Sequence, residues 1–150
     1  MDNIKIRQYL ASDKSRLLEL LMLNTPKHFA ESEYADFNKY LDTEIEQYFV
    51  VELDGIIVGA GGINFENNHK IGKISWDIIH PDFQGFGIGR KLLQHRIVLL
   101  KSISSIERIL VRTSQFAFKF YEKNEFIVNE VHKDYWADGF DLYHMIYKKN

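Results

Sequence analysis

Three glycines within five positions mark residues 84–90, which read Gln84-Gly85-Phe86-Gly87-Ile88-Gly89-Arg90. Glycine lets backbone N–H groups approach an anion closely, because it has no side chain to hold the anion away. If a helix starts within this stretch, the N–H groups of its first turn lack intrahelical partners and carry partial positive charge. The stretch therefore predicts a cradle for a phosphate or pyrophosphate group.

The flanking residues favour a strand before this turn and a helix after it. Residues 74–79, Ile74-Ser75-Trp76-Asp77-Ile78-Ile79, are mostly apolar, as in a half-buried strand, and turn chemistry at His80-Pro81-Asp82 ends the run. After the turn, Leu93, Ile97 and Leu100 recur at the spacing of one helical face. Strand, glycine turn and helix therefore follow one another in order.

The same patterns predict one α/β unit over the whole chain, residues 1–150. Gly59, Gly61 and Gly62 predict a bulge or close packing within one strand. We expect Asp13 to cap the first helix and Asn24-Thr25-Pro26 to end it. The expected elements are a strand over 4–9, helices over 14–23 and from 32, a hairpin over 48–53 and 56–65, a strand over 71–79, a helix over 90–100, a strand over 106–112, a helix over 115–123, and a hairpin over 126–133 and 140–147.

Composition excludes several classes of protein. The 150 residues are 45% hydrophobic, which suits one globular domain, and 19 Lys and Arg against 21 Asp and Glu give a net charge of -2. With no long block of one charge, we expect neither a nucleic-acid partner nor a membrane surface. The absence of cysteine excludes disulfides, thiolate metal sites and a cysteine nucleophile. We find no signal peptide or membrane span and expect a soluble, cytoplasmic protein.

The element order, together with Gln84-x-x-Gly87-x-Gly89 and the later Phe120-Tyr121-Glu122-Lys123, resembles the GNAT superfamily of acyl-CoA-dependent N-acetyltransferases. The resemblance covers nearly the whole chain. It implies a mixed, mostly antiparallel central sheet flanked by about four helices, with acetyl-CoA as co-substrate and no metal.

The resemblance also implies a role for particular residues. The turn would bind the pyrophosphate of coenzyme A, and the end of the preceding strand would contact its pantetheine arm. Tyr121 would face the thioester sulfur, where its O–H could donate a hydrogen bond or proton to the departing thiol. The cofactor-binding residues expected on this basis are Ile78, Ile79, Gln84, Gly85, Phe86, Gly87, Ile88, Gly89, Arg90 and Gln115.

Each of these interpretations has a plainer alternative. The turn could bind nothing, and Tyr121 could be a core tyrosine with a satisfied hydroxyl. A dinucleotide site is a further alternative, since Glu107 follows Gly85-x-Gly87 by about 20 residues. However, Arg90 stands where that motif needs a small residue. In the family, Asn124-Glu125-Phe126 would more often contain a glycine, so the local turn there departs from the pattern.

The acceptor side is less well defined by the sequence. An amine must lose a proton to attack a thioester, and Glu66, Asp77 and His80 are candidate bases, as is a chain of waters. The resemblance places substrate selection on the first two helices and the last hairpin, and acidic residues there could attract a cationic amine. Ordinary surface acids and core aromatics are an equally good interpretation. The candidate substrate residues are Phe29, Glu31, Glu33, Tyr34, Glu66, Asp77, Tyr135 and Trp136.

Taken together, the sequence predicts an acetyl-CoA-dependent N-acetyltransferase acting by direct amine attack in a ternary complex. A branch that acetylates ribosomal-protein N-termini has a glutamate where this chain has Leu110, so a small-molecule amine is the preferred acceptor. Acetylation of proteins or peptides and a non-catalytic acyl-CoA-binding module remain alternatives. A homodimer is compatible with the sequence. Gly-x-Ser-x-Gly and His-Glu-x-x-His motifs are absent, which disfavours hydrolases and zinc enzymes.

Overall fold

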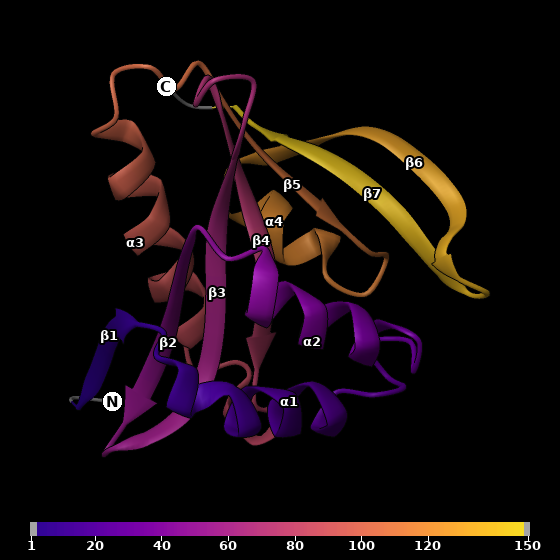
Figure 1. Cartoon of the computed structure of the whole chain (residues 1–150). Coiled ribbons are helices and arrows are strands. Elements are labelled where there is room, and N and C mark those ends of the chain that lie inside the picture. Colours follow the sequence, from indigo (N-terminus) through magenta and orange to yellow (C-terminus); the bar gives the residue numbers. More distant parts are fainter. Residues whose placement is uncertain (1–2, 149–150) are drawn as a thin grey trace.

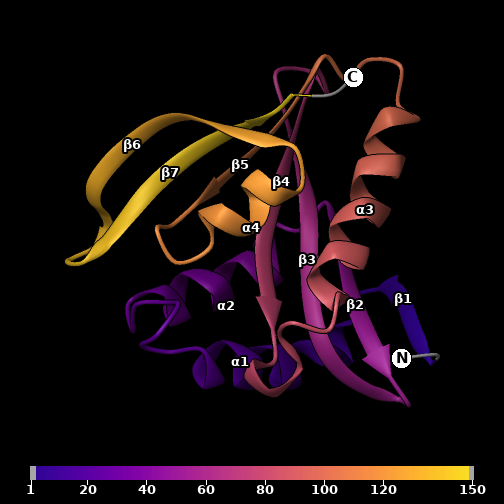
Figure 2. The ribbon, with the colours of Figure 1, turned by 180° about the vertical axis from the view of Figure 1, so that it is seen from behind.

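A computed structural model describes residues 3–148, which form one seven-stranded sheet in the order β1-β2-β3-β4-β5-β7-β6. Helices α1 and α2 cover one face, and α3 and α4 cover the other (Figures 1 and 2). The mostly antiparallel α/β fold expected from the sequence is confirmed. The strands are β1 (Ile4–Gln8), β2 (Gln47–Leu53), β3 (Ile56–Glu66), β4 (Ile71–Ile79), β5 (Arg108–Thr113), β6 (Phe126–Ala137) and β7 (Phe140–Tyr147). The helices are α1 (Lys14–Leu23), α2 (Glu33–Thr43), α3 (Ile88–Lys101) and α4 (Phe118–Lys123), with 3-10 turns over Ala11–Asp13 and Pro81–Phe83.

Two hydrophobic cores lie on opposite faces of the sheet, and β2 shows how the sequence builds them. Tyr48 and Val50 pack with α1 and α2, whereas Phe49 and Val51 pack with α3. Successive side chains of a strand point to opposite faces, so a strand covered on both sides must be apolar without alternation. The continuous apolar run of β2 therefore reflects a sheet with helices on both faces.

The sheet opens between β4 and β5. These two strands are parallel and are connected through α3. Only Ile71–Ile74 of β4 pair with β5, where their partners are Arg108–Val111. Beyond that point β4 continues to Ile79, whereas β5 pairs with β7. The ladder between β3 and β4 shifts between Ala60 and Gly62, as the glycine pattern predicted, and such bulges bend a strand. Trp76 has a left-handed φ of 50°, and its carbonyl accepts a hydrogen bond from the Tyr48 hydroxyl.

The hairpin of β6 and β7 lies at the edge of the sheet and extends past α4 (Figure 1). The first arm was expected to end at Lys133 but continues to Ala137. Asp134 lies in the left-handed region, its N–H donates to Asp141, and its carboxylate accepts the Gly139 N–H. The left-handed conformation and hydrogen bonds of Asp134 let β6 continue past Lys133, where the charged sequence is typical of a loop.

Helix α1 starts at Lys14 as expected, but the expected cap of this helix and the expected start of the helix after β5 were wrong. Asp13 makes no capping bond to α1; its carboxylate instead accepts the Leu10 N–H and binds the Arg7 guanidinium, which lowers the pKa of Asp13. The helix expected from Gln115 starts only at Phe118, because the Gln115 amide bonds to the β6–β7 hairpin. Within residues 3–148 no helix is long and apolar enough to cross a bilayer.

Candidate active site

A cleft of about 990 Å³ follows the opening between β4 and β5. One side is formed by the glycine turn and by α4, and the other by α2, β3 and the turn end of the β6–β7 hairpin. A volume of this size accommodates a drug-sized ligand together with a second small molecule. The cleft therefore has room for two ligands, one on each side of the end of β4.

The glycine turn forms one end of this cleft. Gly85 and Gly87 adopt left-handed φ values of 86° and 82°, which only glycine adopts without strain. Helix α3 starts directly afterwards, and its first backbone bond runs from the Lys91 N–H to the Gly87 carbonyl. The N–H groups of residues 88–90 thus precede the helical ladder, as an anion site at a helix N-terminus requires. Gln84, Gly85, Gly87, Gly89 and Arg90 line the cleft.

Two residues of the turn do not present their side chains to the cleft. The Ile88 side chain is 1% exposed and belongs to the core, whereas Phe86 is 59% exposed to solvent. Only their backbone groups are therefore available to an anion. Ile78 and Ile79, at the end of β4, both line the cleft.

Asn24 fixes the glycine turn to the rest of the fold. It is 2% exposed, and its amide nitrogen donates to the carbonyls of Leu20 and Ile79. Its side-chain oxygen accepts a hydrogen bond from Gln84, whose amide also donates to the Ile79 carbonyl. The Gln84 amide thus positions the turn. In the sequence, Leu17, Leu20 and Leu21 form one apolar face of α1, and Asn24 occupies the next position on that face. A polar residue at that position was the signal that could have identified Asn24.

Tyr121 lies at the centre of the cleft, in a buried polar triad with Asp77 and Arg96. The Tyr121 hydroxyl donates to Asp77 Oδ2 over 2.6 Å, and Asp77 Oδ1 lies 2.5 Å from Arg96 Nη1. Arg96 is fully buried and also donates to the Gly62 and Leu92 carbonyls. Burial, together with the charge of Asp77, raises the pKa of Tyr121 well above its usual value. The hydroxyl therefore stays protonated at physiological pH and remains a proton donor.

Gly61 explains how the sheet accommodates this triad. A Cβ atom at position 61 would collide with Asp77 Oδ1 and would lie 2.8 Å from Arg96 Nη1. Gly61 sits at the bulge between β3 and β4, so the missing side chain leaves space for the ion pair within the sheet. The close-packing interpretation of the β3 glycines is thereby confirmed.

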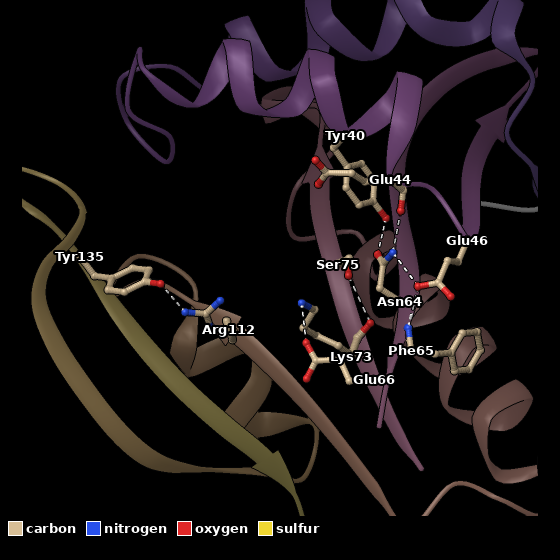
Figure 3. A network of polar contacts seen from close by, with 10 residues as sticks. All are labelled: Tyr40, Glu44, Glu46, Asn64, Phe65, Glu66, Lys73, Ser75, Arg112 and Tyr135. Carbon is tan, nitrogen blue, oxygen red and sulfur yellow. Dashed lines mark hydrogen bonds and ion pairs between the residues drawn. The ribbon is translucent and has the colours of Figure 1, made fainter. Parts of the chain in front are cut away.

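On the side of the cleft away from the glycine turn, polar side chains of α2, β3 and β4 gather beside Arg112 of β5 and the hairpin (Figure 3). The Tyr40 hydroxyl donates to Asn64, which donates to Glu46, and Glu46 also accepts the Phe65 N–H. Lys73 and Glu66 form an ion pair of 3.1 Å. The polar groups in this region are therefore already hydrogen-bonded within the protein, and Lys73 and Glu66 neutralise each other.

Two charged residues that line the cleft, Glu33 and Arg112, form no ion pair within residues 3–148. Glu33 is 9% exposed, and its carboxylate accepts the Ala30 N–H. Burial raises the pKa of Glu33 above its usual value. Arg112, in β5 just past the point where β4 and β5 separate, donates to the Tyr135 hydroxyl over 2.6 Å. Its guanidinium also lies over the rings of Tyr135 and Trp136, at 5.1 and 5.7 Å from their centroids.

The other residues selected from the sequence fall into two groups. Phe29 and Trp136 line the cleft, with Phe29 stacked on Trp76. Glu31 is exposed, and Tyr34 faces a separate shallow depression between α1 and α2. The Gln115 amide is engaged with the hairpin rather than with the cleft, and His80 accepts the Asp82 N–H within the 3-10 turn. Glu31, Tyr34, Gln115 and His80 are therefore not brought into the cleft.

No group of three or more His, Asp or Glu side chains within residues 3–148 is arranged to hold a metal ion. The cleft is instead lined by backbone amides, aromatic rings, buried hydroxyls such as that of Tyr121, and charged side chains. This set of groups suits an anionic cofactor and an amine substrate.

Comparison with known proteins adds a family assignment and a fold match. A model of the Acetyltransferase (GNAT) family matches residues 14–126. The fold is similar to that of an aminoglycoside 6'-N-acetyltransferase solved in complex with coenzyme A, with a TM-score of 0.77 and 13% identity. That match covers 97% of this chain and 98% of the other.

Sequence relatives fall into two groups that differ in how much of each relative is matched. An N-alpha-acetyltransferase of Sulfolobus acidocaldarius is 26% identical over 95% of this chain and 91% of its own length. An amino-acid acetyltransferase of Pasteurella multocida is 27% identical over 79% of this chain. The matched region spans only 26% of that second, longer relative.

Proposed function

The chain belongs to the GNAT acetyltransferase family, and we propose that it transfers the acetyl group of acetyl-CoA to a primary amine of a small molecule, with residues 1–150 acting as one catalytic domain. The observation that carries this proposal is the placement of the glycine turn and the Tyr121 hydroxyl in one cleft. Residues 1, 2, 149 and 150 lie outside the described residues.

The donor half of the site would be formed by the glycine turn and by β4. Unpaired N–H groups at the start of α3 suit the pyrophosphate of coenzyme A, and Arg90 adds positive charge there. Beyond Ile74, the edge of β4 that faces β5 has no ladder partner among the described strands. Ile78 and Ile79 would contact the pantetheine arm along this edge, where the Ile79 carbonyl already accepts from the Asn24 and Gln84 amides.

The chemical step requires one proton to leave the amine and one to reach the thiolate. The amine nitrogen attacks the thioester carbon, a C–N bond forms, and the C–S bond breaks. Tyr121 would donate its proton to the departing sulfur. The hydroxyl is bonded to a carboxylate that Arg96 already pairs, so this hydrogen bond can be exchanged for one to a developing thiolate.

Glu33 is the best candidate for the group that takes the amine proton. It lies in the cleft, and its raised pKa makes its carboxylate a stronger base than an exposed glutamate. Glu66, by contrast, is paired with Lys73, and Asp77 is paired with Arg96. A water between Glu33 and the amine would serve the same purpose.

Acetylation of a protein or peptide N-terminus is the second candidate function. It is supported by the N-alpha-acetyltransferase of Sulfolobus acidocaldarius, because that relative is matched over nearly its whole length. A small-molecule acceptor is supported by Leu110 and by the amino-acid acetyltransferase of Pasteurella multocida. The two candidates differ in the acceptor alone, and the donor site is common to both.

The proposal is tested by measuring acetyl-CoA-dependent thiol release with a panel of amines, amino acids, polyamines and peptides. For Tyr121→Phe we expect acetyl-CoA affinity near that of wild type and a loss of kcat of about 10²- to 10⁴-fold, the usual contribution of a general acid. Tyr147→Phe is the matched control, because Tyr147 packs in the same core against Phe126 and does not line the cleft. Thiol release that no amine stimulates would contradict the proposal.

A further inference from the structure

We infer that the acceptor carries a carboxylate in addition to its primary amine, and that Arg112 binds this carboxylate. The inference rests on the proposed function, since it concerns the acceptor side of the same cleft. Arg112 lines this cleft and lies just past the point where β4 and β5 separate.

The guanidinium of Arg112 is held in place by two aromatic side chains. It lies over the rings of Tyr135 and Trp136, and it donates one hydrogen bond to the Tyr135 hydroxyl. Trp136 is itself fixed, because its indole N–H donates to the Thr113 carbonyl. A cation held by stacked rings loses little side-chain entropy when it binds a ligand, so its position is prepared in advance.

Most donors of Arg112 remain available to a ligand. A guanidinium has five N–H donors, and within residues 3–148 the Tyr135 hydroxyl is its one hydrogen-bond partner. No ion pair joins Arg112 to a carboxylate among these residues. Figure 3 shows Arg112 between the hairpin and the polar residues of β3 and β4. Two parallel N–H groups of a guanidinium match the two oxygens of a carboxylate, which makes this the favoured ligand.

The acids of the acceptor side do not offset this charge. Glu66 is paired with Lys73, and Glu46 accepts hydrogen bonds from Asn64 and from the Phe65 N–H. Glu33 is bonded to the Ala30 N–H, and Glu44 is an exposed residue that lies 3.9 Å from Lys39. None of these acids pairs with Arg112. Glu33 and Glu46 nevertheless keep their own charge, because a hydrogen bond from a neutral group does not neutralise a carboxylate.

This charge distribution separates classes of amine. A polyamine or another purely cationic amine would find the carboxylates of Glu33 and Glu46 but would leave the Arg112 guanidinium without an anion. An amine with a carboxylate, in contrast, would bring the missing anion. An acceptor with both an amine and a carboxylate is either a free amino acid or a peptide with an acidic side chain near its N-terminus. The test includes both.

The test compares matched acceptors that differ only in the carboxylate. Kcat and KM are measured with free amino acids, with the corresponding amino-acid amides, and with peptides that have or lack an acidic residue near the N-terminus. We expect wild type to prefer the carboxylated member of each pair. A preference confined to free amino acids identifies the α-carboxylate, and one confined to acidic peptides identifies a side chain.

Arg112→Gln should raise KM for the carboxylated acceptors by about 10- to 100-fold, as expected for the loss of a charge-assisted pair. KM for the amides should stay close to that of wild type, and Arg112→Lys should retain part of the preference. Calorimetric binding of acetyl-CoA should be unchanged and serves as the measure of intact folding. Lys133→Gln is the control, because Lys133 is an exposed cation on the same hairpin and outside the cleft.

The possible failures are distinguishable. If amines are acetylated but the carboxylated and amide acceptors have equal KM, or if Arg112→Gln affects both equally, this inference is wrong and the proposed function stands. If no acceptor is acetylated, the proposed function is wrong, and this inference fails with it.

Discussion

At the scale of single residues, Glu31 and Glu33 are only two positions apart in the sequence but differ in solvent exposure, and burial raises the pKa of Glu33. Glu31 precedes α2 and is exposed, whereas Glu33 starts the helix, lines the cleft and is nearly buried. Burial disfavours the charged form of an acid, which raises its pKa. The two residues therefore provide a matched pair for testing the proposed base.

Glu33→Gln should remove the acidic limb of the pH profile of kcat/KM. A base must be deprotonated to accept a proton, so wild-type activity should fall as the pH is lowered through the raised pKa of Glu33. The variant should lose about 10²- to 10⁴-fold in kcat/KM near neutral pH. Steady-state kinetics across the pH range check this, with Glu31→Gln as the control. An unchanged acidic limb in Glu33→Gln would show that another group takes the proton.

Sequence patterns identified the residues that local chemistry marks and missed those that depend on distant partners. Tyr121 and the glycine turn were recognisable because each belongs to a short motif with a resemblance to support it. Arg96 was not, since it lies among apolar residues on the buried face of α3, and its role is visible only from its contacts with Asp77 and Gly61. Gln115 has the right chemistry for a cofactor contact but bonds to the hairpin instead.

At the scale of elements, the order of the structure follows the hydrophobic periodicity closely, because each strand and helix buries its apolar face. The ends of helices and strands were less predictable where a side chain bonds to a distant segment instead of to its own element. Asp13 binds Arg7 instead of capping α1, and β6 continues through Asp134 because of hydrogen bonds across the hairpin. Both outcomes depend on contacts between segments rather than on local propensity.

The glycine turn is the element on which donor binding depends, and Gly87→Ala should weaken it. Gly87 has a left-handed φ of 82° and open space around it, so an alanine there is strained without a steric clash. The cost of about 1–2 kcal/mol should relax the turn and raise the Kd of acetyl-CoA by roughly 5- to 10-fold. Isothermal titration calorimetry measures this change.

Gly55→Ala is the matched control for that experiment. Gly55 has a similar φ of 81° and similarly open surroundings, but it lies in the β2–β3 turn, outside the cleft. Both variants should lose comparable stability in denaturant unfolding, whereas acetyl-CoA affinity should fall only in Gly87→Ala. Equal affinities for acetyl-CoA in the two variants would show that the glycine turn does not contribute to acetyl-CoA binding.

At the scale of the whole molecule, the opening between β4 and β5 connects the two layers of the fold. The glycine turn leads into α3 on one face of the sheet, while α2 lies on the other, and the cleft joins them at the end of β4 (Figures 1 and 2). The buried triad of Tyr121, Asp77 and Arg96 occupies this junction. Donor and acceptor can therefore approach Tyr121 from opposite sides, as a direct transfer in a ternary complex requires.

Mass spectrometry of the acceptor after incubation with enzyme and acetyl-CoA tests this central claim most directly. A free amino acid and its amide serve as acceptors, and free thiol is measured in the same samples. The account predicts an acceptor that gains one acetyl group in proportion to the thiol released, with both products greatly reduced in Tyr121→Phe. Release of thiol without an acetylated amine, or acetylation that does not depend on Tyr121, would contradict it.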